Sequence, residues 1–185
     1  MTFALAVVGG AGSGKSTVAR RLARRTRAVY LDKDALAGPL VEAALAANGQ
    51  PGDERESNAY YLEHVMPAEY AALFAVANDN LRLGRSVVID APFAAYLDQP
   101  AFFTEAADKA GWPALPHTVL HVSASETTTR RRLAERGLPR DTVKLADWDA
   151  FWPKWGDLTI SWTGVRVLRL NNDLHPNIED VVARL

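Results

Sequence analysis

The sequence predicts an α/β fold in which helices cover both faces of a parallel sheet. Five short apolar segments alternate with segments of helical periodicity, and this alternation is typical of parallel strands joined by helices. A glycine-rich motif directly follows the first apolar segment. Because the length of 185 residues suits one compact domain, we expect residues 1–185 to form a single domain with a small lid.

Five strands are expected in this sheet. The first covers residues 4–8, an unbroken apolar run that is typical of a strand buried on both faces. The other four are predicted at residues 28–31, 86–89, 117–122 and 165–170. All five are short, as buried parallel strands usually are.

Helices are expected between and after these strands. Apolar spacing and end signals predict them at residues 15–25, 67–83 and 176–185. Another helix follows a capping box of Ser123 and Glu126 and ends at Arg136, before Gly137. The chain from about residue 34 to 61 is less regular, with a break at residues 48–53.

Composition excludes several classes of function. The chain has no cysteine, so disulfides, thiolate catalysis and cysteine metal sites are excluded. Its net charge of −1 gives no global basic field, so a nucleic-acid partner is not expected. No apolar run approaches the ~18 residues of a membrane span, and residues 1–8 lack the basic start of a signal peptide. We expect a cytoplasmic protein without a membrane partner; the sequence leaves monomer and dimer open.

A phosphate-binding loop is the most specific motif in the chain. It consists of Gly9, Gly10, Ala11, Gly12, Ser13, Gly14, Lys15 and Ser16, followed by Thr17. The spacing matches a P-loop, whose backbone N–H groups surround an anion at the start of a helix. We expect Lys15 to reach the β- and γ-phosphates of ATP and the Ser16 hydroxyl to bind Mg²⁺.

Carboxylates follow two of the predicted strands, where open α/β sheets place their ligands. Asp90 ends the third strand in the manner of a Walker B acid, so we expect it to hold Mg²⁺ directly or through water; a turn or cap before Pro92 is the alternative. Asp32 and Asp34 follow the second strand and point the same way if the chain stays extended.

A kinase needs a carboxylate that accepts the proton of the attacking hydroxyl. We assign this role to Asp34, and assign Asp32 to a Mg²⁺-bound water or to the substrate. The alternative is that one of the two carboxylates caps a helix starting near Ala35.

Arginines are concentrated in the segment that we interpret as the lid, about residues 125–145. Arg132 and Arg136 are four residues apart and share a helix face, and Arg140 lies beyond the glycine stop. We expect at least one of these three to meet the ATP phosphates, because guanidinium groups stabilise the charge of phosphoryl transfer. Arg130 and Arg131 are expected in solvent, and a solvated basic surface is the alternative for the whole group.

The order of these motifs resembles the small P-loop kinases. This group of AAA-type ATP-binding proteins includes shikimate kinase, gluconate kinase, chloramphenicol phosphotransferase, the polynucleotide kinases and the zeta-type toxins. The resemblance implies a three-layer P-loop NTPase fold with strand order 2-3-1-4-5, ATP as donor and an acceptor site between about residues 34 and 65. It also implies that Asp34 is the base. The loop after the last strand, with Asn171, Asn172 and residues up to Pro176, is implied to contact adenine.

Two further residues are candidates for contact with the acceptor. Arg55 lies in the implied acceptor segment, where it would suit an anionic acceptor, although a surface salt bridge is an equal alternative. Phe93 follows Asp90 and is expected either to wall an apolar pocket or to pack in the core. The acceptor itself is not specified, since the glycine pair that shikimate kinases carry after strand three is replaced here by residues 90–93, Asp-Ala-Pro-Phe.

We therefore expect an ATP- and Mg²⁺-dependent kinase that acts on a small hydroxylated molecule. One alternative is a nucleic-acid end kinase or a toxin-like sugar-nucleotide kinase. A second is a non-catalytic module that senses ATP. The Asp-x-Asp pair and the arginines of the lid argue against the second alternative, because binding alone needs neither.

Overall fold

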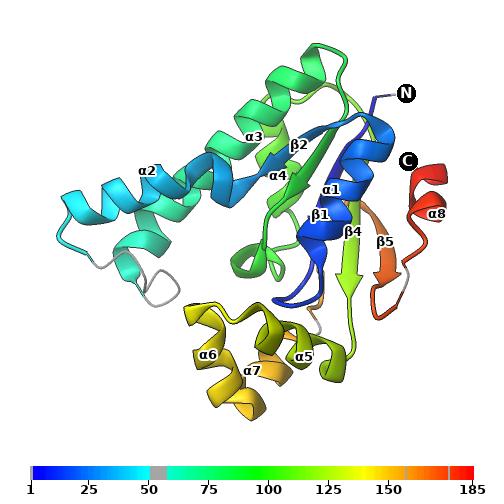
Figure 1. Ribbon diagram of the computed structural model, residues 1–185. Coiled ribbons are helices and arrows are strands. Elements are labelled where there is room, and N and C mark those ends of the chain that lie inside the picture. Colours follow the sequence, from blue (N-terminus) through cyan, green and yellow to red (C-terminus); the bar gives the residue numbers. More distant parts are fainter. Residues whose placement is uncertain (1, 51–57, 157, 175) are drawn as a thin grey trace.

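The computed structural model describes residues 2–50, 58–156, 158–174 and 176–185. Its centre is a parallel sheet of five strands in the order β2-β3-β1-β4-β5 (Figure 1). The strands are β1 (Ala4–Val8), β2 (Val29–Asp32), β3 (Val87–Asp90), β4 (His117–Ser123) and β5 (Arg166–Asn171). The predicted fold class and strand order are confirmed, and the strand boundaries shift by no more than one residue.

The central strand β1 and its neighbour β3 are buried along their whole length. Every residue of β1 and of β3 is buried, as the unbroken apolar runs of these segments predict for strands covered on both faces. The register places Val7 opposite Asp90 and Asp32 opposite Asp90. The carboxylates of the second and third strands therefore meet at the same carboxyl edge, beside the end of β1.

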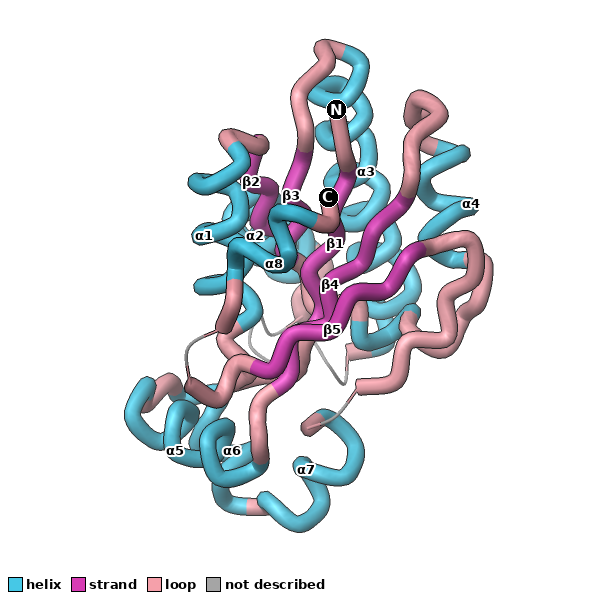
Figure 2. Tube along the Cα trace, turned by 90° about the vertical axis from the view of Figure 1, so that its right-hand side faces the viewer, coloured by secondary structure: helices cyan, strands magenta, loops and turns pink. Residues whose placement is uncertain are grey.

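Helices form a layer on each side of the sheet (Figure 2). On one side, α1 (Lys15–Thr26) and α8 (Ile178–Ala183) pack against the face that carries Leu5 and Val7. On the other side, α3 (Met66–Arg82) and α4 (Phe102–Lys109) pack against the opposite face of the same strand. Alternation of side chains along β1 thus supplies both hydrophobic cores.

Two groups of helices extend beyond these layers (Figure 1). The first projects from the side of β2 and comprises α2 (Lys33–Ala47) and a π-helical turn, η2 (Tyr61–Val65), which pack on α3. The second lies beyond the carboxyl end of the sheet and comprises α5 (Glu126–Arg136), α6 (Pro139–Ala146) and α7 (Trp148–Trp155). A short 3₁₀ turn, η3 (Ala94–Tyr96), follows β3. No helix in the described ranges is both long and apolar enough to cross a membrane.

The helices α4 and α6 lie where no helix was predicted, and two other helices differ from the prediction in their local signals. The segment that starts at Lys33 is a helix of 15 residues, although it lacks amphipathic periodicity and contains Pro39. The predicted capping box of Ser123 and Glu126 is wrong. Ser125, and not Ser123, is the N-cap of α5, and its hydroxyl accepts a hydrogen bond from the Thr128 N–H. Ser123 instead ends β4.

Candidate functional site

The phosphate-binding loop leads from β1 into α1. Gly14 is the N-cap of α1 and has a φ of 82°, a left-handed conformation that glycine adopts without strain. No side chain caps this helix end, and its first turn contains no acidic residue. The N–H groups at the start of α1 therefore face the loop with an unneutralised positive dipole, which suits a bound phosphate.

Close packing on the outer side of the loop leaves room only for glycine. A Cβ on Gly14 would overlap the Asn172 side chain, and one on Gly10 would overlap the backbone carbonyl of Trp155. The loop after β5 and the end of α7 thus lie directly against the phosphate-binding loop. This packing brings the predicted adenine loop and the end of α7 against the same site.

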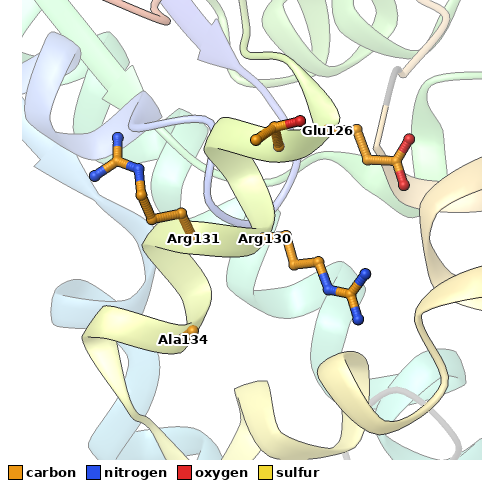
Figure 3. Close-up of a pocket in the computed structure, with 5 residues that line it drawn as sticks. Glu126, Arg130, Arg131 and Ala134 are labelled. Carbon is orange, nitrogen blue, oxygen red and sulfur yellow. The ribbon is translucent and has the colours of Figure 1, made fainter.

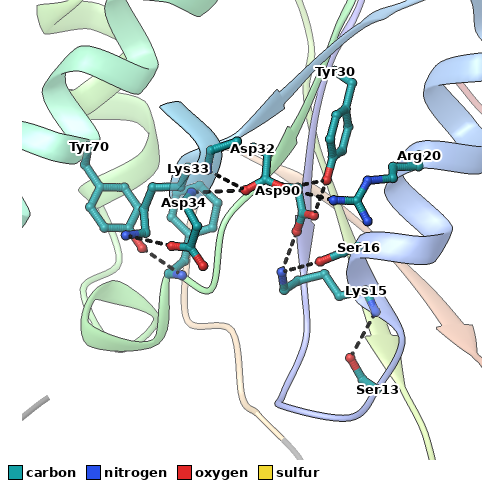
Figure 4. A network of polar contacts seen from close by, with 12 residues as sticks. Ser13, Lys15, Ser16, Arg20, Tyr30, Asp32, Lys33, Asp34, Tyr70 and Asp90 are labelled. Atoms are coloured by element: carbon teal, nitrogen blue, oxygen red, sulfur yellow. Dashed lines mark hydrogen bonds and ion pairs between the residues drawn. The ribbon is translucent and has the colours of Figure 1, made fainter. Parts of the chain in front are cut away.

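Lys15 and Asp90 form an ion pair at the centre of the site (Figure 4). The Tyr30 hydroxyl donates to Oδ2 of Asp90 at 2.6 Å. Burial opposes ionisation of Asp90, but the Lys15 ammonium and hydrogen bonds from Lys15, Tyr30 and Ser16 outweigh it and hold the pKa of this carboxyl below its usual range. Asp90 is therefore ionised, and it lies beside Ser16. The oxygens of these two side chains are the ones expected to hold Mg²⁺.

Asp32 caps α2, one of the alternatives that the sequence left open. Its Oδ1 accepts the backbone N–H groups of Asp34 (3.0 Å) and Ala35 (3.2 Å). Its Oδ2 lies 3.1 Å from Nη2 of Arg20 and 3.0 Å from the Tyr30 hydroxyl. Tyr30 therefore lies between the carboxylates of two neighbouring strands, and burial next to these two anions raises the pKa of the phenol.

Asp34 points into solvent at the start of α2. Its side chain is 62% exposed, and its Oδ1 lies 3.3 Å from Nζ of Lys33. The carboxylate is free of the capping bonds that occupy Asp32. It is therefore accessible to an incoming molecule.

A buried ion pair beneath Asp34 was missed in the sequence. Nζ of Lys33 lies 2.9 Å from Oε1 of Glu69, and the two side chains are only 5% and 2% exposed. The Tyr61 hydroxyl donates to Oε2 of Glu69 at 2.6 Å. Nothing in the local pattern identified this pair, because Glu69 is 36 residues from Lys33 along the chain and looks like an ordinary acid in the first turn of a helix.

Arg132 binds the back of the phosphate-binding loop. Its guanidinium donates to the carbonyl oxygens of Gly12 (3.4 Å), Ser13 (3.3 Å) and Asn172 (2.6 Å). The Asn172 side chain donates to the same Ser13 carbonyl at 2.7 Å. The side chains of Arg132 and Asn172, two of the predicted nucleotide-site residues, thus both bind main-chain carbonyl groups of the phosphate-binding loop.

The other predicted arginines lie further along the lid. Arg136 forms two hydrogen bonds of 2.7 Å with the carboxylate of Asp141. Arg140 lies in α6, and its side chain is outside the part of the structure that is described. Arg130 and Arg131 leave α5 in different directions along an open depression on its outer face (Figure 3), and both are exposed, as expected.

The loop after β5 is joined to the start of α5. The carboxylate of Asp173 accepts hydrogen bonds from the N–H and the hydroxyl of Ser125, at 2.7 and 2.8 Å, and these bonds hold the pKa of Asp173 well below its usual range. The Asn171 amide lies 3.1 Å from the other oxygen of Asp173. Pro176 is half-buried at the end of this loop. The predicted adenine loop is therefore anchored to the lid.

The two candidate acceptor contacts have different outcomes. Phe93 is fully buried in the aromatic core between α3 and α4, so the structure shows the packing alternative. Its φ of 56° is unusual for a residue with a side chain, and its N–H donates to the Tyr70 hydroxyl at 2.9 Å. Arg55 lies outside the described residues.

The architecture matches known proteins along its whole length. A family model described as an AAA domain, AAA_33, matches residues 5–152. No curated protein sequence matches the chain. A sugar kinase from Janibacter sp. HTCC2649 is 18% identical with a TM-score of 0.61, and the match covers 100% of this chain and 92% of that one. A gluconokinase from Sinorhizobium meliloti 1021 is 17% identical with a TM-score of 0.52, covering 98% and 87%. At these identities the structures share a fold.

Proposed function

Because this chain belongs to the AAA_33 family of AAA domains, we propose that it is a kinase that transfers the γ-phosphate of ATP to a hydroxyl group of a small molecule. The observation that carries the proposal is the meeting of Asp32, Asp34 and Asp90 with Lys15 at one edge of the sheet. The sugar kinase and the gluconokinase that share this fold support it.

The phosphate-binding loop is proposed to hold the triphosphate of ATP. Residues 9–17 offer backbone N–H groups and the uncapped start of α1, which fit a phosphate chain. Lys15 then turns from Asp90 toward the β- and γ-phosphates, exchanging one anionic partner for another.

The side chains present also fit Mg²⁺. Ser16 and Asp90 supply hard oxygen donors, with Asp32 next to Asp90 in the register, and Mg²⁺ in such sites needs only one or two protein oxygens besides phosphates and waters. When bound with the nucleotide, Mg²⁺ supplies charge neutralisation at the phosphate oxygens. The role of Asp90 and Ser16 is to fix the position where this neutralisation occurs.

Asp34 is proposed to be the general base. As the acceptor oxygen forms its bond to the γ-phosphorus, its proton passes to the Asp34 carboxylate and the bond from phosphorus to the leaving oxygen of ADP breaks. An exposed carboxylate at the carboxyl edge of β2 suits this role, whereas the oxygens of Asp32 are engaged in capping and ion pairing. We assign Asp32 to orientation of this edge, through Arg20 and Tyr30.

The lid and the loop after β5 are proposed to complete the nucleotide site. Arg132 supports the phosphate-binding loop from behind, and Arg136 and Arg140 are proposed to approach the phosphates when the lid moves over them. Asn171, Asn172 and the chain up to Pro176 are proposed to border the adenine. The acceptor is proposed to enter between α2, η2 and the lid. Arg55 stays a proposed acceptor contact, and it lies outside the described residues.

An Asp34→Asn variant tests the proposal. It keeps the size of the side chain and removes the proton acceptor, so ATP affinity should stay within about 3-fold while acceptor-dependent turnover falls by about 100-fold or more. ATP binding is measured by calorimetry and turnover by ADP release. Turnover at the wild-type rate in this variant would show that Asp34 is not the base.

A further inference from the structure

The buried ion pair of Lys33 and Glu69 takes no direct part in the phosphoryl-transfer scheme. Both side chains are almost fully buried, and Lys33 also lies 5.8 Å from the centre of the Tyr70 ring. A buried ion pair is often no more stabilising than apolar side chains of the same size, because both charges lose their hydration. Stability of the fold alone therefore does not account for placing two charges here.

The position of the pair indicates a role at the site. Among the described residues, two carboxylates lie next to Nζ of Lys33: the buried Glu69 at 2.9 Å and the exposed Asp34 at 3.3 Å. Glu69 holds the ammonium at the boundary between the protein interior and the acceptor side. Its negative charge also compensates that of Lys33, so the buried pair as a whole is neutral.

We infer that Lys33 is a positioning residue that fixes the carboxylate of Asp34 for proton abstraction, and that Glu69 holds Lys33 in place. The inference rests on the proposed function, since it acts through the proposed base. An exposed aspartate at a helix start otherwise samples several rotamers. Contact with an ammonium that is itself fixed from below restricts the carboxylate, and orientation of a catalytic group contributes strongly to rate.

The same network reaches the segment proposed to bind the acceptor. The Tyr61 hydroxyl donates to Glu69, and Tyr61 opens the π-helical turn η2. Isolated π-helical turns occur frequently at functional sites. A chain of contacts from Tyr61 through Glu69 and Lys33 thereby links the conformation of η2 to the orientation of Asp34.

The test is a double-mutant cycle on the full chain. Lys33→Met alone would leave Glu69 buried without its cation and could unfold the protein, so the main variant is Lys33→Met combined with Glu69→Gln. This pair of changes removes both charges together and keeps an oxygen acceptor for Tyr61. It is made in the wild type and in the Asp34→Asn background, with Lys33→Arg as the conservative variant. Arg25→Met, which breaks the exposed pair of Arg25 with Glu179, is the control.

We expect kcat of the doubly substituted protein to fall about 10- to 100-fold, with KM for ATP within about 3-fold of wild type. In the Asp34→Asn background the same two changes should alter the residual rate less than about 3-fold, because their target is already absent. Lys33→Arg should retain part of the rate, and Arg25→Met nearly all of it.

Three results would overturn the inference. The first is a folded double variant, shown by near-UV circular dichroism, with wild-type kcat. The second is an equal fall of kcat in both backgrounds, which would show that Lys33 acts independently of Asp34. Absence of acceptor-dependent ADP release from the wild type itself would remove the proposed function and this assignment together, and only that result affects the proposed function.

Discussion

The ammonium group of Lys15 pairs with Oδ1 of Asp90, so the cation of the phosphate-binding loop is neutralised by the acid that ends β3. The pair lies between two hydrogen-bonding systems. On one side Tyr30 joins Asp90 to Asp32, and on the other Lys15 lies 3.5 Å from the Ser16 hydroxyl. Under the proposed function, the nucleotide phosphates take the place of Asp90 beside Lys15. The strength of the Lys15–Asp90 pair therefore sets how much of the positive charge of Lys15 is available to the incoming ATP.

The ionisation of Asp90 should make stability depend on pH. Because the pKa of Asp90 is held below its usual range, the ionised form stabilises the folded protein fully above the ordinary carboxyl value of ~3.9, and this contribution is lost as pH falls through the folded-state pKa. The difference in unfolding free energy between wild type and Asp90→Asn, from urea denaturation, should therefore be largest above about pH 5 and shrink below about pH 4. A difference that is constant with pH would contradict the ion pair.

Glycine substitutions should separate the nucleotide site from helix α2. Gly14→Ala places a Cβ onto Asn172 at a φ of 82°, so it should destabilise the protein and abolish measurable ATP binding. Gly38→Ala is the matched control, since Gly38 lies within α2 with open space around its Cβ position. Because Pro39 follows and disfavours the helical conformation for a preceding residue that carries a Cβ, this substitution should change the unfolding free energy by less than about 1 kcal/mol and leave ATP binding intact. Thermal unfolding with and without ATP measures both, and ATP binding by Gly14→Ala would contradict the description of the loop.

Arg132 should matter for stability before any nucleotide binds. Arg132→Met removes hydrogen bonds to the carbonyl groups of Gly12, Ser13 and Asn172. The expected loss is about 1.5–3 kcal/mol of unfolding free energy, the range for hydrogen bonds to charged groups, together with weaker ATP binding. The neighbouring Arg131→Met breaks an exposed pair with Glu135 and should change stability by less than about 1 kcal/mol. Equal effects of the two substitutions on urea denaturation would show that the Arg132 contacts carry no weight.

Regular features of the sequence predicted most of the fold. The alternation of apolar strands with helices led to the correct parallel sheet, and the motif at residues 9–17 led to the group of P-loop proteins. These features are local, or repeat with a fixed period. The strand order was implied by the resemblance to that group. The helix from Lys33 was expected only as an alternative, starting near Ala35, because its residues are apolar on nearly all sides and thus show no period that sets one face apart.

Side-chain partners across the fold could not be predicted in the same way. Asp32 and Asp34 look equivalent in the sequence, yet one is a helix cap and the other is exposed. The distinction depends on the backbone direction at the end of β2, which a two-residue pattern does not specify. The contacts of Glu69 with Lys33 and of Asp173 with Ser125 join segments that are 36 and 48 residues apart, so they become visible only when the helices and loops are placed in space.

The most direct test of the proposed function is ADP release from ATP and Mg²⁺ in the presence of a panel of hydroxylated acceptors. The panel includes sugars, nucleosides, amino-alcohol antibiotics and nucleic-acid ends, and Lys15→Ala is the control. We expect release that depends on one class of small acceptor, and a fall of at least about 100-fold in Lys15→Ala, the order seen when one stabilising donor is lost. Tight ATP binding without release for any acceptor would contradict the kinase and favour a module that senses ATP.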